Sequence, residues 1–186
     1  MFHFFNKKDK TSLLGIDLNP NYIAIVELIK EKNHKFKLNN YAYKPLIGGW
    51  MSEEFVKEEE QLGQFISNIL HSERIKTKRC AISLPTQSVM RKTFEIDKKM
   101  KEREIENAII HSGKKYIIHN IDEVYFDFKV ISDPEDDDDN QEVLLVASKK
   151  KNITTREDAL VIAGLEPKIV DIEQYAMERG LSLVKY

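Results

Sequence analysis

Three segments rich in apolar residues follow one another near the start of the chain, and the last of them alternates apolar and polar residues. Residues 12–18 form an apolar run that stops at residues 19–21, whose Asn-Pro-Asn sequence is a strong turn signal. Residues 22–29 and 35–43 follow, and the second of these changes phase through a bulge before Tyr41. Short segments of this kind, separated by polar turns, are typical of antiparallel strands. We therefore predict three consecutive antiparallel strands.

The apolar spacing then changes to that of a helix. From Ser52 onward, apolar residues recur at three- and four-residue intervals, which predicts an amphipathic helix. Residues 79–84 form a further strand that ends at Pro85, so the order is β-β-β-α-β. The apolar stripe of the predicted helix consists of Phe55, Leu62, Phe65, Ile66 and Ile69.

A second pattern begins near Ser88. Residues 89–96 predict a strand, residues 101–117 a helix, and residues 123–131 and 142–148 two more strands. The result is a strand-helix-strand-strand module. Its last two strands are joined by an acidic segment with an aspartate run at 136–139. This run lacks the central glycine and the bidentate glutamate of an EF-hand, so we interpret it as a solvated hairpin loop.

The C-terminal part predicts a helix, a strand and a final helix. Thr154 and Glu157 form a capping-box pattern for a helix start, and Gly164 and Pro167 are stop signals. A short strand follows. Asp171 is the expected cap of the last helix.

The composition narrows the class of function. The 186 residues are 41% hydrophobic and 32% charged, as in soluble globular proteins. A net charge of -2 provides no positive field for nucleic acid, so we expect no nucleic-acid partner. Phenylalanines at positions 2, 4 and 5 precede lysines at 7, 8 and 10, whereas a signal peptide has its positive charges before its apolar segment. Cys80 is the only cysteine in the sequence. We expect a cytoplasmic protein with a buried, inert thiol.

One segment has candidate cofactor chemistry. Asp17 ends a predicted strand before a tight turn, where a carboxylate can hold hydrated magnesium and turn amides can face phosphate. Asp17 is thus a candidate metal ligand, and Asp17, Asn19 and Asn21 are candidate cofactor-binding residues. Asp and Asn are equally good plain turn residues.

The five histidines are scattered, and the sequence has no nucleophile elbow and no Gly-rich phosphate loop, so we expect no enzyme.

Several segments, in order, resemble the PilM family, the cytoplasmic component of type IV pilus assembly platforms. Residues 13–28 are similar to its opening hairpin, and residues 81–96 to its crossing into an inserted module. Residues 142–180 contain the family's AGL-P-VVD-E-YA-R pattern in the form "AGLEPKIVDIEQYAMER". The resemblance extends from about residue 12 to residue 182.

The resemblance implies a mixed α/β (α+β) fold of the ribonuclease-H/actin-like type. Residues 1–86, completed by residues 166–186, would form the actin-like subdomain. Residues 87–165 would form the inserted strand-helix-strand-strand module and the helix after it. Members of the family bind ATP between two such halves, and they act in the inner-membrane complex that drives pilus extension, twitching motility or DNA uptake in competence.

The resemblance also implies partners. Family members hold the N-terminal cytoplasmic tail of the membrane protein PilN in a groove near the inserted module. We expect a cytoplasmic scaffold, peripheral to the inner membrane, that contacts a PilN-like tail and other pilus platform proteins and can self-associate. The expected partner-binding residues are Pro85, Thr86, Gln87, Ser88 and Met90.

Two departures from the family pattern affect the nucleotide. Pro20 has no N–H to offer a phosphate, and Ala24 stands where relatives place a lysine. The second half of the cleft does not appear in the sequence, so ATP and magnesium are expected only in a full-length form. The alternative is a related actin-like ATPase of secretion or cell division, such as a secretion-system cytoplasmic platform or an FtsA-like protein. An independent actin-fold ATPase or kinase would need a second phosphate motif and an adenosine loop.

Overall fold

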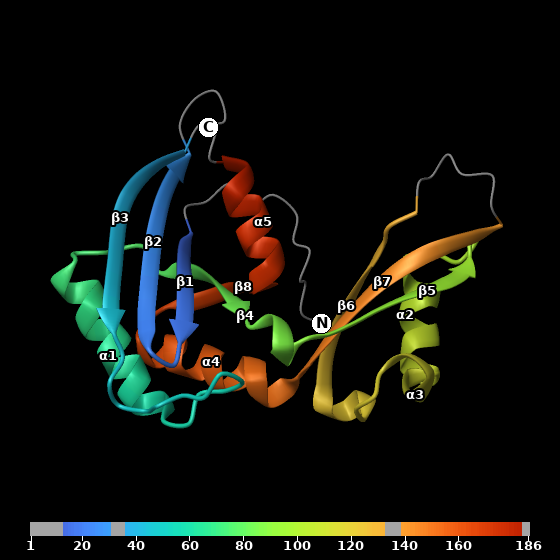
Figure 1. The fold of residues 1–186 in the computed structure, drawn as a ribbon, viewed down its shortest axis with the longest axis horizontal. Helices are drawn as coiled ribbons and strands as arrows, with labels where there is room; N and C mark the ends of the chain where they lie inside the picture. Colours follow the sequence, from blue (N-terminus) through green and yellow to red (C-terminus); the bar gives the residue numbers. More distant parts are fainter. Residues whose placement is uncertain (1–12, 31–35, 133–138, 184–186) are drawn as a thin grey trace. The chain divides into compact units, whose positions relative to one another are not determined.

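The computed structural model describes residues 13–30, 36–132 and 139–183. These residues belong to two compact units (Figure 1). The larger unit includes residues 13–88 and 151–183, and the smaller one residues 89–150. From the sequence, the helix that follows the module is expected to belong to the inserted region, residues 87–165. In the structure the smaller unit ends at Lys150, so most of that helix belongs to the larger unit.

A five-stranded sheet forms the centre of the larger unit, in the order β3-β2-β1-β4-β8. β1 pairs antiparallel with β2 and β2 antiparallel with β3, which confirms the three antiparallel strands expected from the sequence. β4 is parallel to β1, and β8 is parallel to β4. The strands are β1 (Leu14–Asn19), β2 (Tyr22–Lys30), β3 (Phe36–Pro45), β4 (Arg79–Leu84) and β8 (Glu166–Ile172).

Alternation along β1 decides which residues face the core. Leu14, Ile16 and Leu18 are buried, and Asp17 therefore points to the other face of the sheet near the carboxyl end of the strand. β4 alternates in the same way. Its Cys80 is 0% exposed, and burial raises the pKa of the thiol to about 12, in agreement with a buried, inert cysteine.

The predicted bulge lies in β3 at Asn39. Glu27 pairs with Asn40 and Leu28 with Leu38, so Asn39 is the extra residue. The buried Glu27 carboxylate accepts hydrogen bonds from the amides of Asn39, at 2.6 Å, and of Asn40, and from the hydroxyl of Thr77. Burial alone would raise the pKa of Glu27, but the three hydrogen bonds together lower it by more than burial raises it, so the net shift is downward. An ionised carboxylate thus stabilises the bulge.

Helix α1 (Glu59–Ser72) begins later than predicted. Ser52, the expected start, instead forms a local turn in which its Oγ accepts from the Phe55 amide at 3.2 Å, and Met51 pairs with Val56. Phe55 therefore lies outside the helix. The prediction was wrong here because a side-chain hydrogen bond to the backbone competes with the first helical turn.

Helix α4 (Lys150–Ile162) begins earlier than predicted. Thr154 and Glu157 lie inside it and not at its start, and the Thr155 hydroxyl donates to the Lys151 carbonyl at 2.9 Å. Helix α5 (Glu173–Leu183) follows β8 directly. Asp171, the expected cap, belongs to β8, where it accepts from the Ile172 amide at 2.7 Å and pairs with Arg179.

The smaller unit is a three-stranded antiparallel sheet in the order β5-β7-β6, with one main helix. The helix predicted over 101–117 is divided into α2, which ends at His111, and the single turn α3. Ile105 and Ile109 of α2 pack with Val143 and Leu145 of β7. The elements are β5 (Met90–Asp97), α2 (Glu102–His111), α3 (Gly113–Tyr116), the 3-10 turn η3 (Ile121–Glu123), β6 (Val124–Val130) and β7 (Asn140–Lys149).

The segment that joins β6 to β7 contains the aspartate run. Residues 133–138 lie outside the described residues, so the interpretation of the run as a solvated hairpin loop stays a prediction. The antiparallel pairing of β6 with β7 requires a connection at this end of the module.

Candidate functional site

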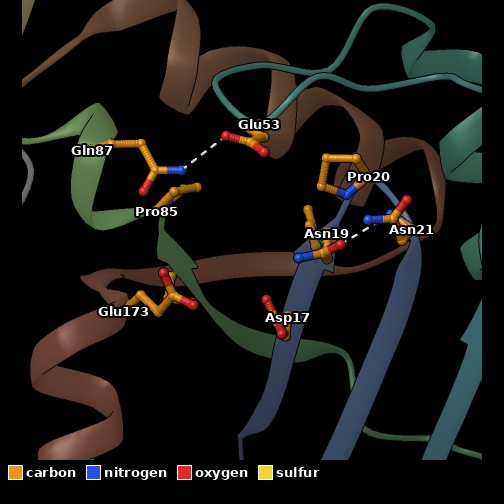
Figure 2. A pocket seen from close by; sticks show the side chains of 10 residues that line it. Asp17, Asn19, Pro20, Asn21, Glu53, Pro85, Gln87 and Glu173 are labelled. Atoms are coloured by element: carbon orange, nitrogen blue, oxygen red, sulfur yellow. Dashed lines mark hydrogen bonds between the residues drawn. The ribbon is translucent and has the colours of Figure 1, made fainter.

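A pocket of about 140 Å³ opens in the larger unit at the carboxyl ends of β1 and β4. Its walls are the β1–β2 turn, the loop before α1, the 3-10 turn η2 (Thr86–Ser88) and the start of α5 (Figure 2). The carboxyl ends of strands are the usual position of ligand sites in open α/β sheets. The lining residues are Asp17, Leu18, Asn19, Pro20, Asn21, Glu53, Ser83, Pro85, Gln87 and Glu173.

Asp17 lines the pocket, and it has a hydrogen-bond partner that was not expected from the sequence. The Tyr22 hydroxyl donates a hydrogen bond to Asp17 Oδ2 at 2.9 Å. This bond, together with burial, raises the pKa of Tyr22 to about 12, so the phenol stays protonated at neutral pH. The Tyr22 ring stacks on Tyr43 with centroids 5.0 Å apart. Tyr22 lies across the hairpin from Asn19, and this register is the signal that could have revealed it.

The polar backbone groups of Asn21, in the β1–β2 turn, are hydrogen-bonded within the protein. The Asn21 amide donates to Asn19 Oδ1 at 3.0 Å, and the Asn21 carbonyl accepts from the Leu46 amide at 2.8 Å. Pro20 has no amide hydrogen. Asn19 and Asn21 line the pocket, but neither Pro20 nor Asn21 can present an N–H to a phosphate in this arrangement.

The charges at the pocket are negative. Asp17, Glu53 and Glu173 are among its ten lining residues, and no lysine or arginine is. Ala24 lies directly opposite Asp17 in the β1–β2 register, at the position where the family pattern has a lysine. A triphosphate would meet three carboxylates with no cation to offset them. These lining residues on their own do not fit a nucleotide phosphate.

Asp17 is also the residue predicted to bind magnesium. No group of three or more His, Cys, Asp or Glu side chains in the described ranges is arranged to hold a metal ion. Magnesium commonly keeps several waters and takes one or two carboxylates together with phosphate oxygens. Asp17 could supply one such carboxylate, and the assignment stays a prediction.

The predicted partner-binding residues divide between the two units. Pro85 and Gln87 line the pocket, and Thr86 lies beside them in η2. Gln87 Nε2 donates to Glu53 Oε2 at 3.2 Å, while the Ser88 amide closes the turn onto the Pro85 carbonyl at 2.9 Å. Met90 instead begins β5, where it packs on the core of the smaller unit.

Arg156 positions one wall of the pocket, and sequence reasoning missed it. Its side chain is 0% exposed, and its Nη2 donates to the Glu53 carbonyl at 2.9 Å. Its Nη1 donates to the Asn152 carbonyl at 2.8 Å and to the Glu54 carbonyl. Burial lowers the pKa of the guanidinium to about 10, so it remains charged at neutral pH. An arginine among charged helix residues resembles a surface residue, and only the fold shows that it is buried.

Sheet order and site together define the class of protein. Three antiparallel strands are followed by two strands parallel to the first, and the pocket lies at the first hairpin. A strand-helix-strand-strand module is inserted after the fourth strand. This is an α+β protein of the actin-like class, with a ribonuclease-H/actin-like subdomain.

The particular family follows from comparison with known proteins. Residues 15–186 match the family described as type IV pilus assembly protein PilM, and the chain belongs to this family. The fold is similar to that of a PilM-PilN type IV pilus biogenesis complex, with a TM-score of 0.80 and 23% identity over 93% of this chain and 51% of that chain. It is also similar to the cytoplasmic domain of EpsL from Vibrio cholerae, an inner-membrane component of the type II secretion system.

The EpsL similarity has a TM-score of 0.56 and 16% identity, and it covers 87% of this chain and 57% of that chain. This chain therefore spans a little over half of the length of each of these two structures. None of the helices among the described residues is both long and apolar enough to span a membrane.

Proposed function

We propose that the chain is a cytoplasmic scaffold of the type IV pilus inner-membrane assembly complex that binds the N-terminal tail of a PilN-like membrane protein. Membership of the PilM family is the observation that carries the proposal. The fold similarity to a structure described as a PilM-PilN complex supports this choice of partner. Its place would be peripheral, at the inner-membrane face, where it would also contact other platform proteins.

The proposed tail site is the part of the predicted segment that lies in the larger unit, residues 85–88. Gln87 is exposed, and its side-chain amide bonds Glu53 at the rim of the pocket. Because this bond lies in water, Gln87 could exchange it for a bond to a peptide group at little cost. Thr86 offers a further polar side chain beside it. The nearby carboxylates of Asp17 and Glu173 favour a tail that has positive charge.

The proposed activity of this chain is binding without catalysis. The negative pocket and the internally bonded turn support this proposal, because both work against holding a phosphate. Any linkage to a nucleotide would belong to a full-length form, in which Asp17 could supply a carboxylate to magnesium.

Titration with a peptide of the family-like Asn-Leu-Leu-Pro type tests the tail site. We expect NMR shifts at the amides of residues 86–88 and weaker binding by Gln87→Ala, because the side-chain amide that would bond the peptide is removed. Gln64→Ala is the matched control, since Gln64 is exposed on α1 and its side chain bonds that of Asn68. Shifts clustered in the acidic segment at 133–139, or equal binding by both variants, would show that the assignment is wrong.

A further inference from the structure

A second concave surface lies in the larger unit, where the chain leaves α1 for β4 (Figure 1). Its hollow of about 390 Å³ falls within the range of roughly 300–1,000 Å³ that is usual for ligand pockets. The floor of the hollow is apolar and consists of Leu70, Ile75 and Ala163, which are 4%, 6% and 5% exposed. The proposed function does not use this hollow, which shares no lining residue with the pocket at Asp17.

The rim of the hollow is basic. Arg74, Lys76 and Lys78 line it together with His71, and no carboxylate is among its lining residues. These four residues are exposed. Across the described ranges, the side chains of Arg74, Lys76 and Lys78 form no hydrogen bond and no ion pair. The rim therefore suits a partner that has negative charge.

The fold around the hollow is complete without these cations. Basic side chains often stabilise the free carbonyls at the end of a helix. At the end of α1, however, the carbonyls of residues 69–71 accept hydrogen bonds from the backbone amides of residues 73–75 at 2.9 to 3.1 Å. Glu73 is the one acidic residue between positions 71 and 79, and it pairs with Lys44 at 2.8 Å. The three cations thus remain available to a ligand.

Arg74 has a backbone conformation that favours glycine. Its φ is 55°, and no other non-glycine residue in the described ranges has a positive φ. It comes directly after Glu73, the C-cap of α1, at the position where helices commonly have glycine. A side chain at such a position costs free energy, and conformations of this kind concentrate at functional sites. Local structure gives no reason for an arginine at this position.

We propose that this hollow binds an acidic segment of a partner protein in which carboxylates flank an apolar side chain. The carboxylates contact Arg74, Lys76 and Lys78 at the rim, and the apolar side chain lies on the floor. A free phosphate would use the rim alone. A bilayer surface suits the hollow less well, because the apolar residues that line it are buried and cannot insert into lipid.

Fluorescence anisotropy with labelled peptides tests the proposal on the chain as it stands. The probe is Glu-Leu-Asp-Leu-Glu, and it is compared with the uncharged Gln-Leu-Asn-Leu-Gln and with Glu-Ser-Asp-Ser-Glu, which has no apolar side chain. We expect the probe to bind at least about tenfold more tightly than either, because only the probe matches both rim and floor. Equal binding of the two acidic peptides would overturn the proposal. So would binding to vesicles of phosphatidylcholine and phosphatidylglycerol in the absence of peptide binding, which would assign the surface to lipid.

Variants at the rim locate the site. Arg74→Gly should weaken binding of the probe at least about fivefold and also raise the Tm, because it removes a cation and relieves the backbone. Lys76→Gln combined with Lys78→Gln leaves the backbone unchanged and should weaken binding by a similar factor. Lys57→Gln is the charge-matched control, since Lys57 is exposed and precedes the other end of α1, and it should bind like the parent chain. Unchanged binding by Arg74→Gly, or an equal loss in Lys57→Gln, would refute the proposal.

Discussion

Among the described Asp and Glu side chains, Glu157 is the one whose pKa the fold raises most clearly. It lies on α4, and burial, with a smaller effect from the adjacent Asp158, raises its pKa to about 7. The folded pKa lies above the ordinary value of 4.5. The stability that this group contributes is therefore complete below pH 4.5 and is lost as the pH rises through about 7.

Glu157→Gln should stabilise the chain in a pH-dependent way. At pH 8 the substitution removes a partly buried charge, and after a discount for the part of the side chain that water screens we expect a gain of about 1–2 kcal/mol in the free energy of unfolding. At pH 5 the parent side chain is mostly protonated when folded, so the gain should fall. Urea unfolding followed by circular dichroism at both pH values measures the difference. Glu178→Gln, on the exposed part of α5, should show no such change, and equal gains at both pH values would contradict the reasoning.

At the scale of elements, a glycine decides how closely α1 and α4 approach. A Cβ built on Gly63 would lie 2.7 Å from the Ala159 carbonyl oxygen and 2.6 Å from a methyl carbon of Ile162. Distances this short are not tolerated by real side chains, so the two helices can pack as they do only with glycine at this point. Gly180 of α5, by contrast, has nothing within 4 Å of such a Cβ.

The two helical glycines should respond in opposite directions to alanine. Gly63→Ala should destabilise the chain by about 1–3 kcal/mol, because overpacking outweighs the better helix propensity of alanine. Gly180→Ala should stabilise it by about 0.5–1 kcal/mol, because only propensity changes. Thermal and urea unfolding of both variants provide the test, and a gain in Gly63→Ala would mean that the helices adjust freely.

Elements were predictable from the sequence where local pattern and tertiary structure agree. The β1–β2–β3 strands follow from apolar segments bounded by polar turns, and the bulge before Tyr41 follows from the change of phase within residues 35–43. The starts of α1 and α4 were not predictable, because Ser52 forms a local turn and because α4 already begins at Lys150. Likewise Asp17 was found as a turn residue after an apolar strand, whereas Arg156 was missed because its burial depends on the loop that it contacts.

At the scale of the whole molecule, the charge of the pocket determines its response to nucleotides. The β1–β2 turn has its Asn21 amide bonded to Asn19, and three carboxylates line the same pocket. We expect this chain to bind Mg-ATP weakly or not at all. Calorimetric titration should show no micromolar binding, which would correspond to roughly -8 kcal/mol. Micromolar binding that disappears in Asp17→Ala would show that the pocket accepts the nucleotide after all.

The burial of Cys80 makes the chain a convenient background for site-specific labelling. Burial raises the pKa of the thiol to about 12, so the reactive thiolate is scarce at neutral pH, and the side chain is 0% exposed. It is also the only cysteine in the sequence. A cysteine introduced at an exposed position, for example Ile118→Cys or Ile131→Cys, would therefore be the one thiol that reacts with maleimide dyes or crosslinkers. Distances from that position could then be measured by fluorescence while the native Cys80 is left in place.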